Sequence, residues 1–380
     1  MALQRRGLLH GGLACAALGL PFLTHANPPS WVWAAHDRLL WLQGDELELR
    51  HQLMLPPQAL SAADVHSLYL GQADGTLERV SLRTAQTPER LALGSPLHGL
   101  RLSADGQWLL AATADDLQLL QAPTLQPVRR YPTTTKEGRP AGPMSVLGAV
   151  AARRSLVAAP AALAELWEIY LDPAAEDFYE GLVHDFRFGE GVPTRGHLGR
   201  RRITLPAPLR QLHPSPDHFH VLAWDTEGQL QLLNLDVRRA IQRRPAAAPL
   251  QALPCQWHDR SALALRHPDT LQVLDFDNAR LLHQQALETQ ALWHGAGSLW
   301  AARGDALLQL DPGLQATAHW HQPGYRPLGL QFDLKGLQAL VHWHGPQDRL
   351  VLLDLPSGRE RARREYKKGL LAQTLLQAPW

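Results

Sequence analysis

Short apolar alternations separated by turn residues recur along most of the chain. The clearest copy places three predicted strands within residues 99–120, with an Asp105-Gly106 turn between the first two. Asp-Gly between alternating apolar runs is a strong hairpin signal. The same order of strand, turn and strand returns at 209–236 and, in shorter form, further along. The pattern therefore predicts an all-β protein made of several copies of one antiparallel unit.

The spacing of these copies points to one architecture. The first unit begins near Trp31, and the last good copy runs from Leu328 to Gly358. Repeats of ~40–45 residues with several strands each are typical of β-propellers, and at this period the chain holds roughly eight blades. Spacing alone leaves seven blades open. Residues 178–182 and 361–375 are candidates for short helices, but neither has a clear capping residue.

The N-terminus has the pattern of an export signal. Arg5-Arg6 precedes a mostly small, apolar run to Leu23, and an A-x-A-like site follows near Ala26. Paired arginines favour a twin-arginine signal over residues 1–26, with a Sec signal as the alternative. We expect residues 27–380 to form one periplasmic domain. No later segment reaches 18 consecutive apolar residues, so no membrane span is expected in the mature chain.

Composition and cysteine usage exclude several functions. The 380 residues are 45% hydrophobic, and 37 Lys plus Arg against 36 Asp plus Glu give a net charge of +1, which makes no case for nucleic acid. Of two cysteines, Cys15 lies in the signal and Cys255 has no partner, so no intramolecular disulfide is expected. Without a Cys-x-x-Cys-His motif, no c-type haem is attached. No nucleophile elbow, phosphate loop or Rossmann fingerprint is present.

Residues 165–239 carry a family resemblance. They contain a strand, a long polar loop rich in Gly, Pro and Arg, and further strands, and long loops on a rigid sheet often carry function. In order, the stretch contains Leu166-Trp-Glu-Ile169, Gly181-Leu-Val-His-Asp185 and Leu235-Asp-Val-Arg-Arg239. These pieces resemble the propeller domain that binds haem d1 in cytochrome cd1 nitrite reductase and in NirF- and NirN-type maturation proteins. The weaker resemblance runs from about Val65 to Arg359 and implies eight blades, with haem d1 bound non-covalently at the channel mouth.

The resemblance also implies ligand positions, and several are changed here. The proximal His of the reductases lies in a Tyr-His-Pro-x-Pro-Arg-Val stretch, which corresponds to residues 138–146 and contains Arg139 but no His. A guanidinium cannot ligate iron. The first distal His is missing beside Pro249. The second corresponds to His267, with His258 as a nearby candidate. The alternative for His267 is a surface turn position.

Basic residues are better retained. Arg200, Arg201 and Arg202 are expected in the long loop, where the family has an Arg pair. Arg139 is a further candidate, because guanidinium groups bind haem carboxylates bidentately. The alternative is a solvated basic loop. His98 stands where the family often has Arg, and His98 and His267 are our candidates for a general base.

Two histidine pairs have no counterpart in the resemblance. His319-Trp-His321 and His342-Trp-His344 place two imidazoles on one face of a strand if these segments are extended. Such a pair can bind a metal with a third ligand. The sequence shows no third ligand, so aromatic packing across strands is the favoured interpretation and no metal is assigned.

The sequence thus predicts a periplasmic propeller that acts in haem d1 biosynthesis, carriage or insertion for denitrification. Its expected partners are the tetrapyrrole and either nitrite reductase or other maturation proteins. Oxidation of a haem d1 precursor fits this hypothesis, whereas the missing ligands and c-type haem argue against nitrite reduction. The alternative is a propeller that has lost haem binding and acts as a protein-interaction scaffold, since fold alone does not fix function.

Overall fold

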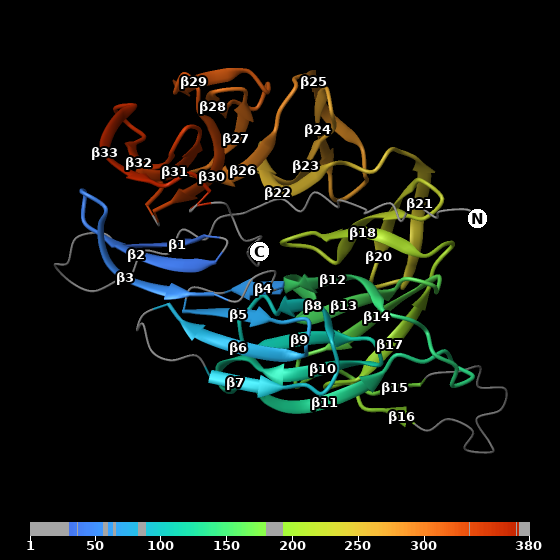
Figure 1. Ribbon diagram of the computed structural model, residues 1–380. Helices are drawn as coiled ribbons and strands as arrows, with labels where there is room; N and C mark the ends of the chain where they lie inside the picture. Colours follow the sequence, from blue (N-terminus) through green and yellow to red (C-terminus); the bar gives the residue numbers. More distant parts are fainter. Residues whose placement is uncertain are drawn as a thin grey trace, which may run out of the picture.

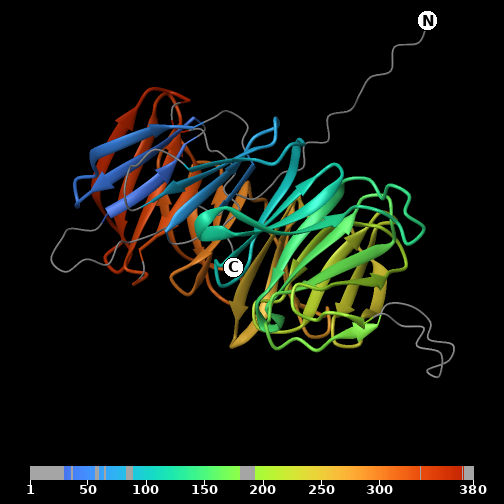
Figure 2. The same ribbon diagram turned by 90° about the horizontal axis from the view of Figure 1, so that it is seen from below.

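The computed structural model describes residues 30–371 except 36, 56–59, 64–65, 83–88, 180–192, 334 and 370. Eight antiparallel sheets surround a central axis in an eight-bladed β-propeller, with the first and last blades side by side (Figures 1 and 2). The predicted all-β fold is confirmed, and the seven-bladed alternative is wrong. The export signal expected at residues 1–26 lies outside the described residues.

Strands follow one another outward from the axis in each blade. The innermost strands are β4 (Leu60–Ala63), β8 (Leu97–Leu102), β12 (Met144–Val150), β18 (Leu209–Pro214), β22 (Gln251–Trp257), β26 (Ala291–Gly295) and β30 (Arg326–Phe332). The second strands are β1 (Ser30–Ala34), β5 (Ser67–Gly71), β9 (Trp108–Thr113), β13 (Ser155–Pro160), β19 (His220–Asp225), β23 (Arg260–Arg266), β27 (Ser298–Arg303) and β31 (Gln338–His344).

The outer half of each blade is built in the same way. The third strands are β2 (Arg38–Gln43), β6 (Thr76–Ser81), β10 (Asp116–Gln121), β14 (Glu165–Tyr170), β20 (Gln229–Asn234), β24 (Thr270–Asp275), β28 (Ala306–Leu310) and β32 (Asp348–Asp354). The outermost strands are β3 (Glu48–Met54), β7 (Glu89–Ala92), β11 (Gln126–Pro132), β17 (Arg200–Thr204), β21 (Arg239–Pro245), β25 (Leu281–Ala286), β29 (Ala316–His321) and β33 (Arg359–Tyr366). Blades 1 to 8 are numbered in chain order from β1–β3 to β30–β33.

Blade 1 contributes three strands to the described residues. In five other blades a register shift marks the pairing of the third strand with the outermost one, as between Leu119 and Leu120. The β2–β3 pair has the same shift between Trp41 and Leu42. Since this irregularity identifies β2 and β3 as the outer pair, β1 occupies the second position of its blade.

Few helical residues occur among those described. Two single 3₁₀ turns, Ala122–Thr124 and Ala151–Arg153, are the helical segments, and neither has the length of a membrane-spanning helix. The prediction of short helices at 178–182 and 361–375 is wrong for the residues of these segments that the structure describes. Phe178–Tyr179 is strand β15, paired with β16 (Pro193–Thr194), and residues 361–366 of the second segment belong to β33.

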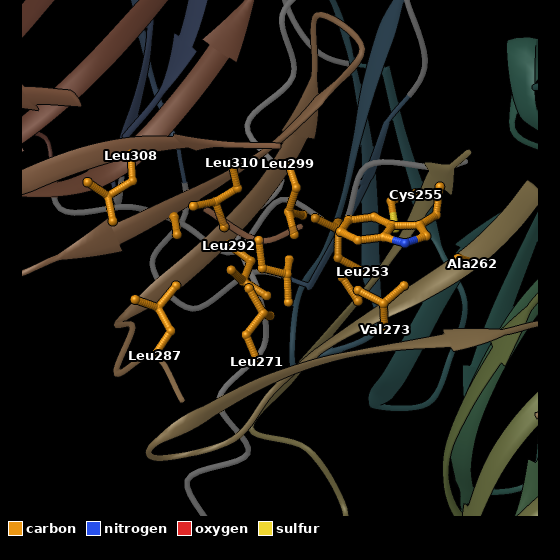
Figure 3. Packing of buried hydrophobic residues seen from close by; sticks show 14 residues of the cluster. Leu253, Cys255, Ala262, Leu271, Val273, Leu287, Leu292, Leu299, Leu308 and Leu310 are labelled. Carbon is orange, nitrogen blue, oxygen red and sulfur yellow. The ribbon is translucent and has the colours of Figure 1, made fainter. Parts of the chain in front are cut away.

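Hydrophobic cores lie between neighbouring blades. The cluster in Figure 3 joins blade 6, through residues such as Leu253 and Val273, to blade 7, through Leu292 and Leu299. Each fully buried Leu or Val contributes about 1.5–3 kcal/mol. Because each sheet has two apolar faces, it needs a neighbour on both sides, and a closed ring meets that need.

Tight packing and hydrogen bonds between the innermost strands of neighbouring blades fix the positions of these strands. A Cβ on Gly148 of β12 would lie 2.6 Å from Leu212 Cδ1 of β18, so only glycine fits there without a shift. Gln251 Nε2 donates to the Leu292 carbonyl of the next blade at 2.7 Å, and its Oε1 accepts from the Leu292 amide at 2.9 Å. Gln331 Nε2 of blade 8 donates to the Val32 carbonyl of blade 1. This last bond helps to close the ring.

A buried acid organises the outer part of blade 5. Asp225 is 2% exposed and accepts hydrogen bonds from the amides of Glu227 and Gln229 and from the side chains of Gln231 and Arg243. Burial alone raises the pKa of Asp225, but these hydrogen bonds outweigh it, so the net pKa is lowered. A carboxylate with this environment stabilises the fold at neutral pH.

We expect Asp225→Ala to lower the free energy of unfolding by roughly 2–3 kcal/mol, because the turn amides and Gln231 lose their acceptor. Chemical denaturation at pH 7.5 measures this loss. Since the folded-state pKa lies below the unfolded one, the contribution is present at neutral pH and declines as the pH falls through the carboxyl range. The difference from wild type should therefore narrow on acidification.

Glu365→Ala is the matched control, because Glu365 forms an exposed ion pair with Arg349. This control should change the unfolding free energy by less than about 0.5 kcal/mol. Equal losses in the two variants would contradict the role assigned to the buried acid.

Candidate functional site

The order of strands gives the propeller two distinct ends. The connections between blades, and those between second and third strands, lie at the end where the innermost strands begin, which we call the start face. The turns between first and second strands lie at the other end, the end face. The seven described innermost strands surround the central axis of the ring. Ligand sites of propellers lie in or over the central channel.

Three of the predicted site residues share the start face. His98 is the exposed second residue of β8, at a register shift between Leu97 and Gly99. Arg139 lies exposed in the connection between blades 3 and 4, with Nη2 at 3.8 Å from Glu137. His267 is half-buried in the turn after β23, and burial is the main cause of its lowered pKa. Their roles as base or ligand-binding groups stay predictions.

His258 lies elsewhere. It occupies an exposed, left-handed position (φ 46°) in the turn between β22 and β23. This turn belongs to the end face, whereas His267 follows β23 at the start face. The seven residues of β23 separate them by about 20 Å. His258 and His267 therefore do not contact one ligand atom together.

The basic run is placed differently from the sequence prediction. Arg200, Arg201 and Arg202 begin β17, the outermost strand of blade 4, rather than lying in a long loop. The first and last stack on Trp167 at 4.4 and 4.8 Å from its ring centroid. Arg202 also donates to the Thr134 carbonyl of blade 3 at 2.7 Å.

An alternating strand and a polar loop have similar compositions here, so the sequence did not separate them. Trp167 supplies the aromatic surface on which Arg200 and Arg202 stack, and β17 pairs with β14. The arginines lie three strands from the channel, and this position does not favour the predicted role in binding carboxylates there. The neighbouring Gly181-Leu-Val-His-Asp185 segment lies outside the described residues.

Two polar residues of the innermost strands were not identified from the sequence. Arg101 of β8 and His213 of β18 occupy the same position in their innermost strands, and Gly148 is their equivalent in blade 4. Both side chains are closely surrounded by protein and keep only part of their surface accessible. At the glycine, Leu212 of blade 5 fills the space that a side chain would take.

Arg101 is a cation without an acidic partner among the described residues. It belongs to none of their ion pairs, and its buried Nε has no hydrogen-bond partner. Burial lowers the pKa of Arg101 to about 10, so the group stays protonated at neutral pH. Burying an unpaired charge is costly, and such a group is suited to an anionic ligand.

His213 provides a neutral imidazole. Burial, together with the positive charge of Arg101, lowers its pKa from 6.5 to about 4. The ring packs edge-on against Trp224 at 6.0 Å between centroids, and Nε2 has no hydrogen-bond partner among the described residues. An uncharged imidazole is the form that binds a metal or accepts a proton.

A signal for His213 was present in the sequence. Residues 213–216 read His-Pro-Ser-Pro, the His-Pro-x-Pro order expected around a proximal ligand, although this ligand was sought at residues 138–146. For Arg101 no local signal exists, because it is a single polar residue in an apolar strand. His294 of β26 lies at the corresponding end of its own strand, and burial lowers its pKa as well.

Comparisons with known proteins concern the fold. No model of a protein family and no curated protein matches this chain. A solved structure of the dihydro-haem d1 dehydrogenase NirN in complex with DHE matches with a TM-score of 0.71, covering 97% of this chain and 82% of that one. The chain has the NirN propeller fold. Sequence identity to NirN is 18%, so the match carries the architecture rather than the chemistry.

We expect acid to destabilise the protein through His213. Its folded-state pKa lies below the unfolded one, so the unfolded chain binds more protons as the pH falls below about 6.5. The unfolding free energy of wild type should therefore fall more steeply between about pH 7 and pH 4.5 than that of His213→Gln. Chemical denaturation across this range measures both slopes. The exposed His319→Gln serves as control and should keep the wild-type slope.

Proposed function

We propose that this protein binds haem d1, or a precursor of it, non-covalently in the propeller channel. In this proposal it acts in the periplasm, in the synthesis, carriage or insertion of that tetrapyrrole for a denitrifying nitrite reductase. The fold shared with NirN supports the proposal, as does the resemblance of residues 165–239 to haem d1 propellers. The lack of a Cys-x-x-Cys-His motif favours a maturation role over nitrite reduction.

The observation that carries the proposal is the largely buried Arg101, which has no acidic partner among the described residues. A tetrapyrrole with carboxylate side chains would supply the missing anion, and a guanidinium binds a carboxylate with two parallel hydrogen bonds. Because the site is shielded from solvent, this pair would be stronger than one on the surface.

His213 fits the iron of such a ligand. It is neutral at physiological pH, and its Nε2 has no hydrogen-bond partner among the described residues. The tetrapyrrole, when bound, would supply the redox chemistry, while His213 would hold its iron and Arg101 its carboxylate. For oxidation of a precursor, His267 and His98 at the start face stay our candidates for the base.

Absorbance titration of the mature chain with haem d1 and with its dihydro precursor tests this function. We expect saturable binding with shifted bands. Arg101→Gln should weaken binding about tenfold to a hundredfold, since a charge-assisted hydrogen bond contributes roughly 1.5–3 kcal/mol. His213→Ala should change the position of the iron-sensitive bands. His319→Ala, on the outermost strand of blade 7, should bind like wild type.

The variants also locate the site. If His98→Ala and His267→Ala weaken binding whereas Arg101→Gln does not, the ligand lies at the start face and our assignment of Arg101 and His213 is wrong. Absence of binding at micromolar concentrations would overturn the tetrapyrrole function. An interaction scaffold would then be the function to pursue.

A further inference from the structure

A compact group of metal-binding side chains lies in blade 8. His342 and His344 are on β31, and Asp348 begins β32, directly opposite His344 in the hairpin register. One nitrogen from each imidazole and one carboxylate oxygen all lie within 4.8 Å of one another. The sequence showed the histidine pair but not the acid, because the hairpin brings Asp348 back across the sheet.

The distances suit a tetrahedral ion. At metal–ligand bonds of 2.0–2.1 Å, two ligand atoms of a tetrahedral zinc site are about 3.3 Å apart. His342 Nε2 lies 3.3 Å from Asp348 Oδ1, and His344 Nδ1 lies 2.7 Å from the same oxygen. The distance from His342 Nε2 to Asp348 Oδ1 already equals that between two ligand atoms of a tetrahedral zinc site. The hydrogen bond from His344 Nδ1 to Asp348 Oδ1 would have to lengthen by a few tenths of an ångström on metal binding.

His342 is the strongest indication of a ligand. Its side chain is fully buried; Nδ1 has no hydrogen-bond partner among the described residues, and the contact of Nε2 is the Asp348 carboxylate at 3.3 Å. Buried polar groups rarely go unsatisfied, because each costs about 1–3 kcal/mol. A metal on Nε2 would satisfy one of these nitrogens. Two imidazoles and a carboxylate are also a common protein ligand set for zinc.

Other blades use a similar acid differently. Asp116 of blade 3 and Asp225 of blade 5 lie at the same turn, and each pairs with an arginine of its own outermost strand, Arg130 or Arg243. In blade 8 the charge partners described for Asp348 are the two histidines. Its Oδ2 accepts the amide of Leu371 at 3.0 Å, which fixes the orientation of the carboxylate as outer-shell bonds do in metal sites.

The group faces the junction between the last and first blades. His342 meets Trp33 of β1 edge-on at 5.8 Å between centroids. Leu340 and Leu350, on the same face of blade 8, belong to one core with Trp31 and Trp33. His344 is 20% exposed, so the site opens to solvent on its side and an ion can enter there.

We propose that His342, His344 and Asp348 bind a zinc-class divalent metal that fastens blade 8 at its junction with blade 1. The ion links the second and third strands of blade 8 through the face that packs on β1, and solvent completes its coordination beside His344. This role concerns the closure of the ring and is independent of the proposed tetrapyrrole site.

Titration of tag-free, chelator-treated protein with Co²⁺ tests the site. We expect one Co²⁺ per chain, with visible absorption bands typical of four-coordinate cobalt, and displacement of these bands by Zn²⁺. Addition of Zn²⁺ should raise the melting temperature. His344→Gln should weaken metal binding by more than about a hundredfold and abolish the rise in melting temperature. Asp348→Asn, which keeps an acceptor for the Leu371 amide, should do the same.

The second histidine pair provides a matched control. His319 and His321 lie on the outermost strand of blade 7, and His321 forms an exposed ion pair with Asp305. The double variant His319→Gln/His321→Gln should therefore bind Co²⁺ as wild type does. His344 is partly exposed, so its variant keeps the test valid even if Asp348→Asn does not fold. Failure of wild type to bind Co²⁺, unchanged binding by His344→Gln, or equal loss in the control would overturn the site.

Discussion

Mutual burial of neighbouring sheets is the constraint on which the rest of the molecule depends. Every blade has two apolar faces, and residues of blade 7 such as Leu292 and Leu299 complete one core of blade 6. A sheet in this position is not stable alone, so the chain has to return to its beginning. The ring closes only if blade 8 packs against blade 1. Buried Trp33 and the hydrogen bond from Gln331 to the Val32 carbonyl stabilise this junction.

Ring closure also explains why the channel contains unusual residues. Innermost strands approach so closely that Gly148 has no room for a Cβ beside Leu212. Once the innermost strands are fixed by cores on both sides, a single polar residue on one of them can be held without its usual partner. Arg101 and His213 are such residues, and the loss of solvation that lowers the pKa of each arises from the rigid ring rather than from their own strands.

The sequence predicted local features well and spatial ones poorly. The turn Asp105-Gly106 and the alternation around it were sufficient for hairpins, and their recurrence was sufficient for a propeller. Arg200–Arg202 was assigned to a loop because composition shows neither the pairing of β17 with β14 nor the stacking of these arginines on Trp167. Arg101 and Asp348 were missed for the same reason. Asp348 matters because the hairpin brings it to His342 and His344. Arg101 matters because no described strand brings an acid to it.

The two proposed sites occupy different layers of the propeller, and this separates their effects. Arg101 and His213 belong to innermost strands, so a ligand there contacts the channel wall and depends on charge and shape. His342 belongs to a second strand and is enclosed between two sheets, away from the channel surface. A metal at His342 would therefore add to the stability of the closed ring, whereas a tetrapyrrole beside Arg101 would neutralise a charge that the ring already holds in place. Because the ring has to close before the channel has walls, the junction between blades 8 and 1 sets the condition under which any channel ligand can bind.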